Sequence, residues 1–186
     1  MRTATRTAGR PIWLVLACFI ALGPFALADG PPSGYAGSDA CAMCHDVVAA
    51  NLAMTTHGKT ARSTPDGASG CEACHGPGAA HVDAGGDPEL MRNLAEIPAD
   101  EAADVCLACH ESGNRNHWKG SAHDGRGVSC VDCHTAHFDG KPPKALLARG
   151  TEADSCATCH MQMKAAMLRS AHMPVREGAM ACSSCH

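Results

Sequence analysis

The pattern of apolar and polar residues predicts short helices joined by extensive loops, with little or no β-sheet. No stretch of the 186 residues convincingly alternates apolar and polar side chains with the two-residue period of a half-buried strand. Helix-start signals, in which a capping residue or a proline precedes acidic side chains, stand before three segments. The expected helices cover about 39–54, 98–110 and 151–169, and the expected loops are 64–70, 76–88 and 139–143.

Six CxxCH pentapeptides recur along the chain and use twelve of its thirteen cysteines. The spacing is typical of covalent haem attachment, in which two thiols add to the vinyl groups of one haem and the following histidine takes one axial position on the iron. We therefore expect six covalently attached haems c. The attachment residues are Cys41, Cys44, Cys71, Cys74, Cys106, Cys109, Cys130, Cys133, Cys156, Cys159, Cys182 and Cys185, and the proximal histidines are His45, His75, His110, His134, His160 and His186.

Zinc and disulfides are the alternative uses of these cysteines. Paired CxxC motifs also bind structural zinc, but zinc does not require a histidine after every second cysteine. Disulfides form in exported chains, but they would not impose one pentapeptide six times. The repeated histidine therefore favours haem.

The motifs fall into three similar units, which indicates an internal repeat. Each unit contains a CxxCH, a linker, a hydroxyl-bearing residue two positions before a histidine, a turn and a second CxxCH. We expect one hexahaem domain over 29–186, built of units at about 38–97, 98–150 and 151–186.

Six further histidines match the number of irons that need a second axial ligand. His57, His123 and His172 stand at equivalent positions in the three units, so each is predicted to be a distal ligand. His81 and His137 follow the second motif of their units too closely to reach the opposite face of the same haem, and we expect them to bind a neighbouring iron. His117 has no counterpart in the other units and is the weakest candidate.

Methionines offer a rival set of axial ligands. Met54, Met161, Met163, Met167, Met173 and Met180 lie near the motifs. Methionine more often fills gaps against apolar surfaces, and the supply of histidines is sufficient. We expect at most one haem with histidine and methionine ligation.

The N-terminus has the features of a secretory signal. Three arginines precede the apolar run Ile12–Leu22, which is too short to span a bilayer comfortably. Residues 26–28 form a small-residue cleavage site before Asp29. We expect Sec export, cleavage after Ala28 and a periplasmic mature chain, 29–186, that has no membrane span.

Two other uses of this segment stay open. A retained anchor helix is disfavoured because the apolar run is short and ends at Gly23 and Pro24. Cys18 follows Val-Leu-Ala, as in a lipoprotein signal. However, only six apolar residues separate Cys18 from Pro11, which is short for an apolar signal region.

The mature chain is acidic and has few residues that form a core. Without the three N-terminal arginines it has 12 basic and 19 acidic side chains, a formal charge of −7. The chain therefore lacks the excess of basic residues that is typical of a nucleic-acid-binding protein. Its negative charge favours docking to positively charged surfaces. The only aromatic residues are Tyr35, Trp118 and Phe138. Because such a chain buries little apolar surface, we expect the haems to form the core.

The segments CEACHGPGAAH, HWKGSAH, VSCVDCHTAH and SAHMPVREGAMACSSCH resemble the doubled-CxxCH multihaem c-type cytochromes. That group includes periplasmic decahaem cytochromes of outer-membrane conduits and of dimethyl-sulfoxide respiration, and a pentahaem donor to nitrite reductase. The resemblance covers nearly all of 38–186 and implies a haem array with bis-histidine ligation. Members continue beyond the motif equivalent to Cys182–His186, so a fragment or truncated product is expected here.

These features favour an electron carrier over an enzyme. The resemblance implies a quinol-oxidising membrane cytochrome as donor, and a terminal reductase or an outer-membrane porin–cytochrome complex as acceptor. The alternative is a multihaem reductase of nitrite, hydroxylamine or a sulfur oxyanion, which requires one iron with an open axial position. Every motif is an ordinary CxxCH, and none carries the lysine of a specialised reductase site. We therefore expect no catalytic residues.

Overall fold

The computed structural model describes residues 34–60, 64, 67–138, 140–169, 174–175 and 177–185. The predicted signal segment, its cleavage site and Cys18 lie outside these residues, as do His172 and His186. Predictions about them stay predictions.

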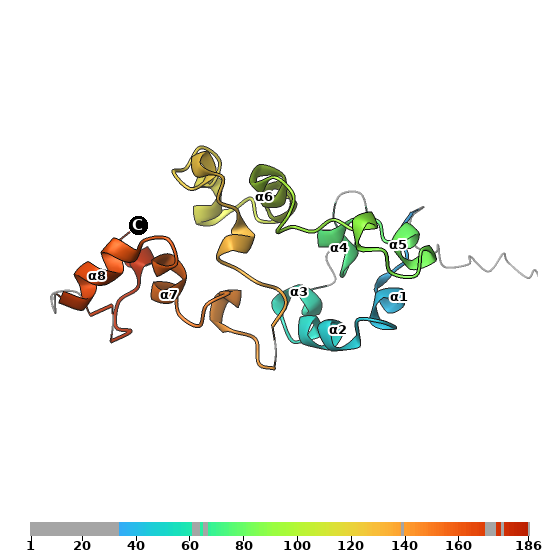
Figure 1. Cartoon of the computed structure of the whole chain (residues 1–186), viewed down its shortest axis with the longest axis horizontal. Helices are drawn as coiled ribbons and strands as arrows, with labels where there is room; N and C mark the ends of the chain where they lie inside the picture. The colour runs from blue at the N-terminus through green and yellow to red at the C-terminus, as the bar shows by residue number, and fades with distance from the viewer. Residues whose placement is uncertain are drawn as a thin grey trace, which may run out of the picture. The chain divides into compact units, whose positions relative to one another are not determined.

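Short helices joined by irregular connections make up the described chain, as Figure 1 shows. No β-strand occurs among the described residues, where an isolated bridge joins His134 and Leu147. The prediction of a mainly α chain with extensive loops is confirmed. The elements are α1 (Ser38–Ala42), α2 (Asp46–Ala53), α3 (Thr56–Lys59), α4 (Glu72–His75), α5 (Ala79–Asp83), η1 (Pro88–Leu90), α6 (Ala99–Leu107), η2 (Gly113–His117), η3 (Asp124–Arg126), η4 (Cys130–Asp132), η5 (Lys144–Leu146), α7 (Glu152–Ala157), α8 (Met161–Arg169) and η6 (Cys182–Ser184).

Two of the predicted helices are interrupted at their CxxCH motifs. The segment 39–54 forms α1 and α2 with a break before Asp46, and 151–169 forms α7 and α8 with a break before Met161. His45 causes the first break because its backbone, at φ −114° and ψ 43°, is not helical. The helix predicted to run through the third motif also ends early, at Leu107.

The predicted helix starts differ in how they are capped. Thr151 caps α7 as expected, since its side chain accepts a hydrogen bond from the Asp154 N–H at 3.1 Å. Ser38 does not cap α1, which begins after Gly37. Its hydroxyl instead accepts a hydrogen bond from the Cys71 N–H at 3.3 Å, so Ser38 joins the first motif to the second.

The polypeptide supplies only a small core of its own. The buried apolar residues of the described chain are Ala68, Ala102, Ala103, Ala157 and Val175. The buried alanines of α6 and α7 lie on helices that contact the turn of the following motif, η4 and η6 respectively. In the second and third units, these buried alanines therefore lie on the helix that meets the second motif of the unit.

Candidate haem sites

The five described motifs share one backbone conformation. In each, the histidine N–H donates a hydrogen bond to the carbonyl of the first cysteine, four residues earlier, at 2.9 to 3.1 Å. Residues i, i+3 and i+4 of such a helical turn lie on the same face. Both thiols and the imidazole of a motif therefore stand on one side of the turn, as attachment to a single flat group requires.

A short capped turn carries two of the additional histidines. Thr55, which is 3% exposed, accepts a hydrogen bond from the Gly58 N–H at 3.1 Å and so caps the turn that holds His57. Ser121 accepts one from the Asp124 N–H at 3.2 Å beside His123. The hydroxyl in the repeat therefore has a structural purpose, because it fixes the turn that presents the histidine.

Four proximal histidines each face another histidine at nearly the same ring spacing. Two metal–nitrogen bonds of about 2 Å, with the distance from each nitrogen to its ring centre, give roughly 6 Å between rings on opposite sides of one metal. The observed spacings therefore fit an axial pair. The pairs and their centroid distances are His45–His81 at 6.4 Å, His110–His57 at 5.9 Å, His75–His137 at 5.8 Å and His160–His123 at 6.2 Å.

Backbone carbonyls orient three of the imidazoles. The Nδ1 atoms lie 2.9 Å from the Arg92 carbonyl in His75, 2.7 Å from the Asp87 carbonyl in His81 and 3.0 Å from the Ala145 carbonyl in His134. Because a carbonyl only accepts, Nδ1 holds the proton in each ring. In the neutral ring this leaves Nε2 with a free lone pair, the form in which histidine binds a metal.

Burial reinforces the neutral form of two further histidines. Burial, together with the nearby rings of His75 and His45, lowers the pKa of His137. Burial and the Arg115 guanidinium likewise lower the pKa of His110. A lower pKa favours the neutral imidazole, which is the form that binds a metal.

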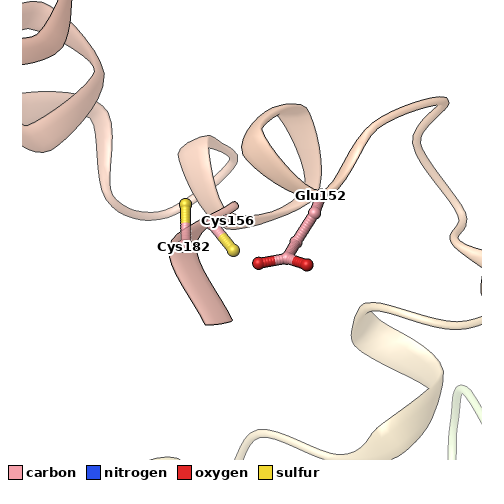
Figure 2. Close-up of side chains that lie close together, drawn as sticks. All are labelled: Glu152, Cys156 and Cys182. Atoms are coloured by element: carbon pink, nitrogen blue, oxygen red, sulfur yellow. The ribbon is translucent and has the colours of Figure 1, made fainter. Parts of the chain in front are cut away.

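The first cysteines of the two motifs in each unit lie together. Figure 2 shows the third unit, where the Cys156 and Cys182 sulfurs lie within 4.8 Å of each other. Burial and the Cys182 thiol raise the pKa of Cys156 to about 11. In the second unit, the hydrogen bond from Cys106 lowers the pKa of Cys130 to about 7.

The first cysteines of the first unit are also in contact. The second cysteines of neighbouring motifs lie near each other where one unit ends and the next begins. Burial and the Cys71 thiol raise the pKa of Cys41. Across the first border, burial raises the pKa of Cys74, with a further contribution from Cys109. Across the second border, the pKa of Cys133 is raised by burial and by Asp132, and also by Cys159. Each motif therefore lies near the motif that follows it in the sequence.

Glu152 lies beside the cysteine pair of Figure 2. The three side chains have the spacing of metal ligands. Among the described residues, they form the cluster that could hold a metal ion. Structural zinc sites take four protein ligands, so this group is one short. Both of its thiols also belong to CxxCH motifs.

The remaining candidates are not brought together. His117 is exposed on η2, and no ring contact joins it to a proximal histidine among the described residues. The methionines Met54, Met161 and Met163 are 41%, 69% and 60% exposed. None of these positions shows the paired geometry of the four histidine couples.

Sequence reasoning missed two residues at these sites. Trp118 lies 6.3 Å from His123, ring to ring, and its indole nitrogen is buried without a partner in the described chain. Glu72 is a buried carboxylate inside the second motif. Glu72 has no sequence signal, because the spacing of CxxCH leaves its two middle positions free. Trp118 stands outside every motif, so the pattern does not mark it either.

The comparisons with known proteins match the CxxCH pattern of the chain. The doubled CXXCH motif family matches residues 123–165, which hold the fourth and fifth motifs. The chain is also 34% identical over 154 residues to the multiheme cytochrome MtrA of Shewanella baltica (strain OS185). That alignment covers 81% of this chain and 45% of the relative, so the chain spans about half the length of the curated relative it matches.

The fold and the sites define a multihaem c-type cytochrome, which carries its haems through CxxCH motifs. Residues 123–165 carry the doubled CXXCH motif, and the chain is similar to a multihaem cytochrome over 81% of its length. The matched segment begins at His123, and the second CxxCH within it ends at His160. These two histidines form one of the four pairs. His57 and His110 stand in the same relation one repeat earlier.

Proposed function

We propose that this chain is a periplasmic hexahaem carrier that relays electrons between redox proteins and catalyses no reaction of its own. The observation that carries the proposal is the histidine pairing, in which four proximal imidazoles each face a second imidazole at 5.8 to 6.4 Å. An iron held between two such rings has no free position for a substrate.

We assign each haem-binding residue a separate role. Two cysteines of a CxxCH form the thioether links, and the following histidine binds one side of the iron. The bound haems supply a one-electron couple between ferric and ferrous iron. The second imidazole for an iron would come from His81 at the site of His45, from His57 at that of His110, from His137 at that of His75 and from His123 at that of His160.

The two remaining proximal histidines are His134 and His186. The Ala145 carbonyl orients His134 for ligation, and we assign its iron a distal ligand from His172 or, less favoured, His117. His186 lies outside the described residues, and its ligation rests on the motif alone.

The cysteine contacts support a relay in the order of the sequence. First cysteines meet within each unit, and second cysteines lie near one another across each border between units. Each haem then has its sequence neighbours as its nearest neighbours. An electron that enters at one end of the array would leave at the other.

The partners follow from the resemblance and from charge. We propose a quinol-oxidising membrane cytochrome as donor, and a terminal reductase or an outer-membrane porin–cytochrome complex as acceptor. The mature charge of −7 favours positively charged docking surfaces. No helix in the described part of the chain has the length and hydropathy to cross a bilayer.

Carbon monoxide separates the carrier from a reductase, because it binds ferrous haem only where an axial position is open or easily vacated. We expect the reduced protein to bind at most two molecules per chain, at the irons of His134 and His186. The four paired sites should stay closed. Binding at three or more sites, or rapid reoxidation by nitrite, would overturn the assignment as a carrier.

A further inference from the structure

One structural position recurs where the two motifs of each unit meet. It is formed by the residue four places before the first cysteine of the first motif and the residue directly after the first cysteine of the second motif. We call it the inter-motif position. Its occupants are Gly37 with Glu72 in the first unit, Ala102 with Val131 in the second and Glu152 with Ser183 in the third.

The first and third units place a carboxylate at this position from opposite sides. The Gly37 N–H donates a hydrogen bond to Glu72 Oε2 at 2.9 Å. The Ser183 N–H donates one to Glu152 Oε1 at 2.6 Å, and the Ser183 hydroxyl donates another to Oε2 at 2.9 Å. A carboxylate therefore links the two motifs in both units. The second motif supplies it in the first unit, and the helix before the first motif supplies it in the third unit.

The second unit has no carboxylate there. Ala102 is 1% exposed on α6, which contacts the η4 turn that contains Val131. The nearest acidic side chain of that turn is Asp132, which is exposed and accepts hydrogen bonds from the backbone and hydroxyl of Ser129. Apolar packing thus replaces the charged link in the middle of the array.

Glu72 is the more strongly buried of the two carboxylates, at 3% exposure. Its Oε1 accepts hydrogen bonds from the Ala36 and Gly78 N–H groups, both at 2.8 Å, in addition to the bond from Gly37. All three partners are donors, so each stabilises negative charge on the oxygens. The ion pairs of the described chain, Lys119–Asp104 and Lys164–Asp154, do not involve Glu72.

Both carboxylates lie next to the attachment points of two haems. Glu72 stands between Cys71 and Cys74 in the second motif, and its charge also acts on the Cys41 thiol of the first. Glu152 lies within 4.8 Å of the Cys156 and Cys182 sulfurs, as Figure 2 shows. A negative charge at such a site favours ferric over ferrous iron, because reduction removes one positive charge.

We propose that Glu72 and Glu152 are tuning residues, which lower the reduction potentials of the first and third haem pairs below those that a neutral side chain would give. The inter-motif position of the middle pair is apolar. The carboxylate of that unit's η4 turn is Asp132, which acts on Cys130 and Cys133 but is exposed, so solvent screens its charge. This inference rests on the haem attachment proposed above.

The test is a spectroelectrochemical titration of the haem-loaded full chain and three variants. Glu72→Gln keeps the size of the side chain and removes its charge, and Glu152→Gln does the same in the third unit. Glu89→Gln is the control, because Glu89 is exposed on η1. Glu72→Asp keeps the charge and serves as the rescue variant.

We expect Glu72→Gln to raise the reduction potential of about two of the six haems, which the absorbance follows. The rise should be roughly a tenfold change in the reduction equilibrium, or about 59 mV for a one-electron couple. Glu152→Gln should shift a different pair upward by less, because Glu152 is only half-buried and better screened by solvent. Glu72→Asp should recover most of the original curve. A Glu72→Gln shift no larger than that of Glu89→Gln would overturn the proposal.

Haem count and spin state keep the two claims separate. If the unaltered chain carried four or fewer haems, the proposed function would fail while the shift caused by Glu72 could still be read. If Glu72→Gln lost haem or became high-spin, its shift would be structural and Glu152→Gln would decide. The absence of a shift in Glu152→Gln would then overturn the inference.

Discussion

The imidazole rings of His57 and His110 lie 5.9 Å apart, although the two residues belong to different units of the repeat. His110 is the histidine of the third CxxCH, and His57 stands on α3 in the first unit. His123 and His160 repeat the arrangement one unit later at 6.2 Å. A histidine of one unit thus faces the first haem site of the next.

Replacing His57 with alanine is expected to open one iron in the second unit. The site of His110 loses its facing imidazole, while the first-unit sites keep His81 and His137. The variant should bind one more carbon monoxide per chain than the unaltered protein and show one new high-spin signal. Unchanged binding would show that His57 is not an axial ligand.

Replacing His123 with alanine should open the iron of His160 in the same way. The gain is again expected to be one carbon monoxide per chain, since the other three pairs do not use His123. A double replacement of His57 and His123 should therefore gain two. If His123→Ala left every haem low-spin, the ligand assignment drawn from the repeat would be wrong.

His117→Ala is the matched control for these variants. His117 is exposed on η2, and its ring is not paired with a proximal histidine in the described chain. We expect the same spin state and the same carbon monoxide binding as in the unaltered protein. A new high-spin haem in this variant would instead make His117 a ligand, with the iron of His134 as the available site.

Asn51 provides a test of the contact between the first two units. Its side-chain amide donates a hydrogen bond to the Phe138 carbonyl at 2.5 Å, beside His137. Asn51→Ala should lower the free energy of unfolding by about 1 kcal/mol, the usual contribution of such a bond. The urea midpoint followed through the haem spin state would measure this loss. A midpoint equal to that of the unaltered protein would show that the bond contributes nothing.

Bis-histidine ligation also predicts the magnetic and redox properties of the whole protein. The oxidised protein should be largely low-spin by electron paramagnetic resonance. Its potentials should be low, because methionine ligation raises them, and coupling between neighbouring haems should spread the titration. A dominant high-spin signal would count against the paired histidines.

The sequence predicted the haem attachment motifs and the repeat, because both are patterns of residue identity at fixed spacing. It could not pair the distal histidines with particular irons. His75 and His137, for example, meet across two units, and only the folded connections between them bring the rings to 5.8 Å. The histidines trailing the second motifs were expected to bind a neighbouring iron, which stays a prediction. The ring contacts place His81 beside His45 and His137 beside His75.

The helix boundaries and Glu72 show a second limit of the sequence. The capping signals located the helix starts at Ala99 and Glu152, but not the breaks at the motifs, which depend on the tight turn of each CxxCH. Glu72 reads as an ordinary acidic residue. Its burial follows from the approach of the backbone at Ala36 and Gly37, far away in the chain.

Intact-mass measurement of protein matured in the periplasm tests the central claim most directly. The six CxxCH motifs, five of which are described in full with thiols and histidine on one side of a turn, should each hold a covalent haem. We predict six haem additions on a chain that starts at Asp29. A count of five would remove one motif from the array, and a count of four or fewer would contradict the account of a hexahaem carrier.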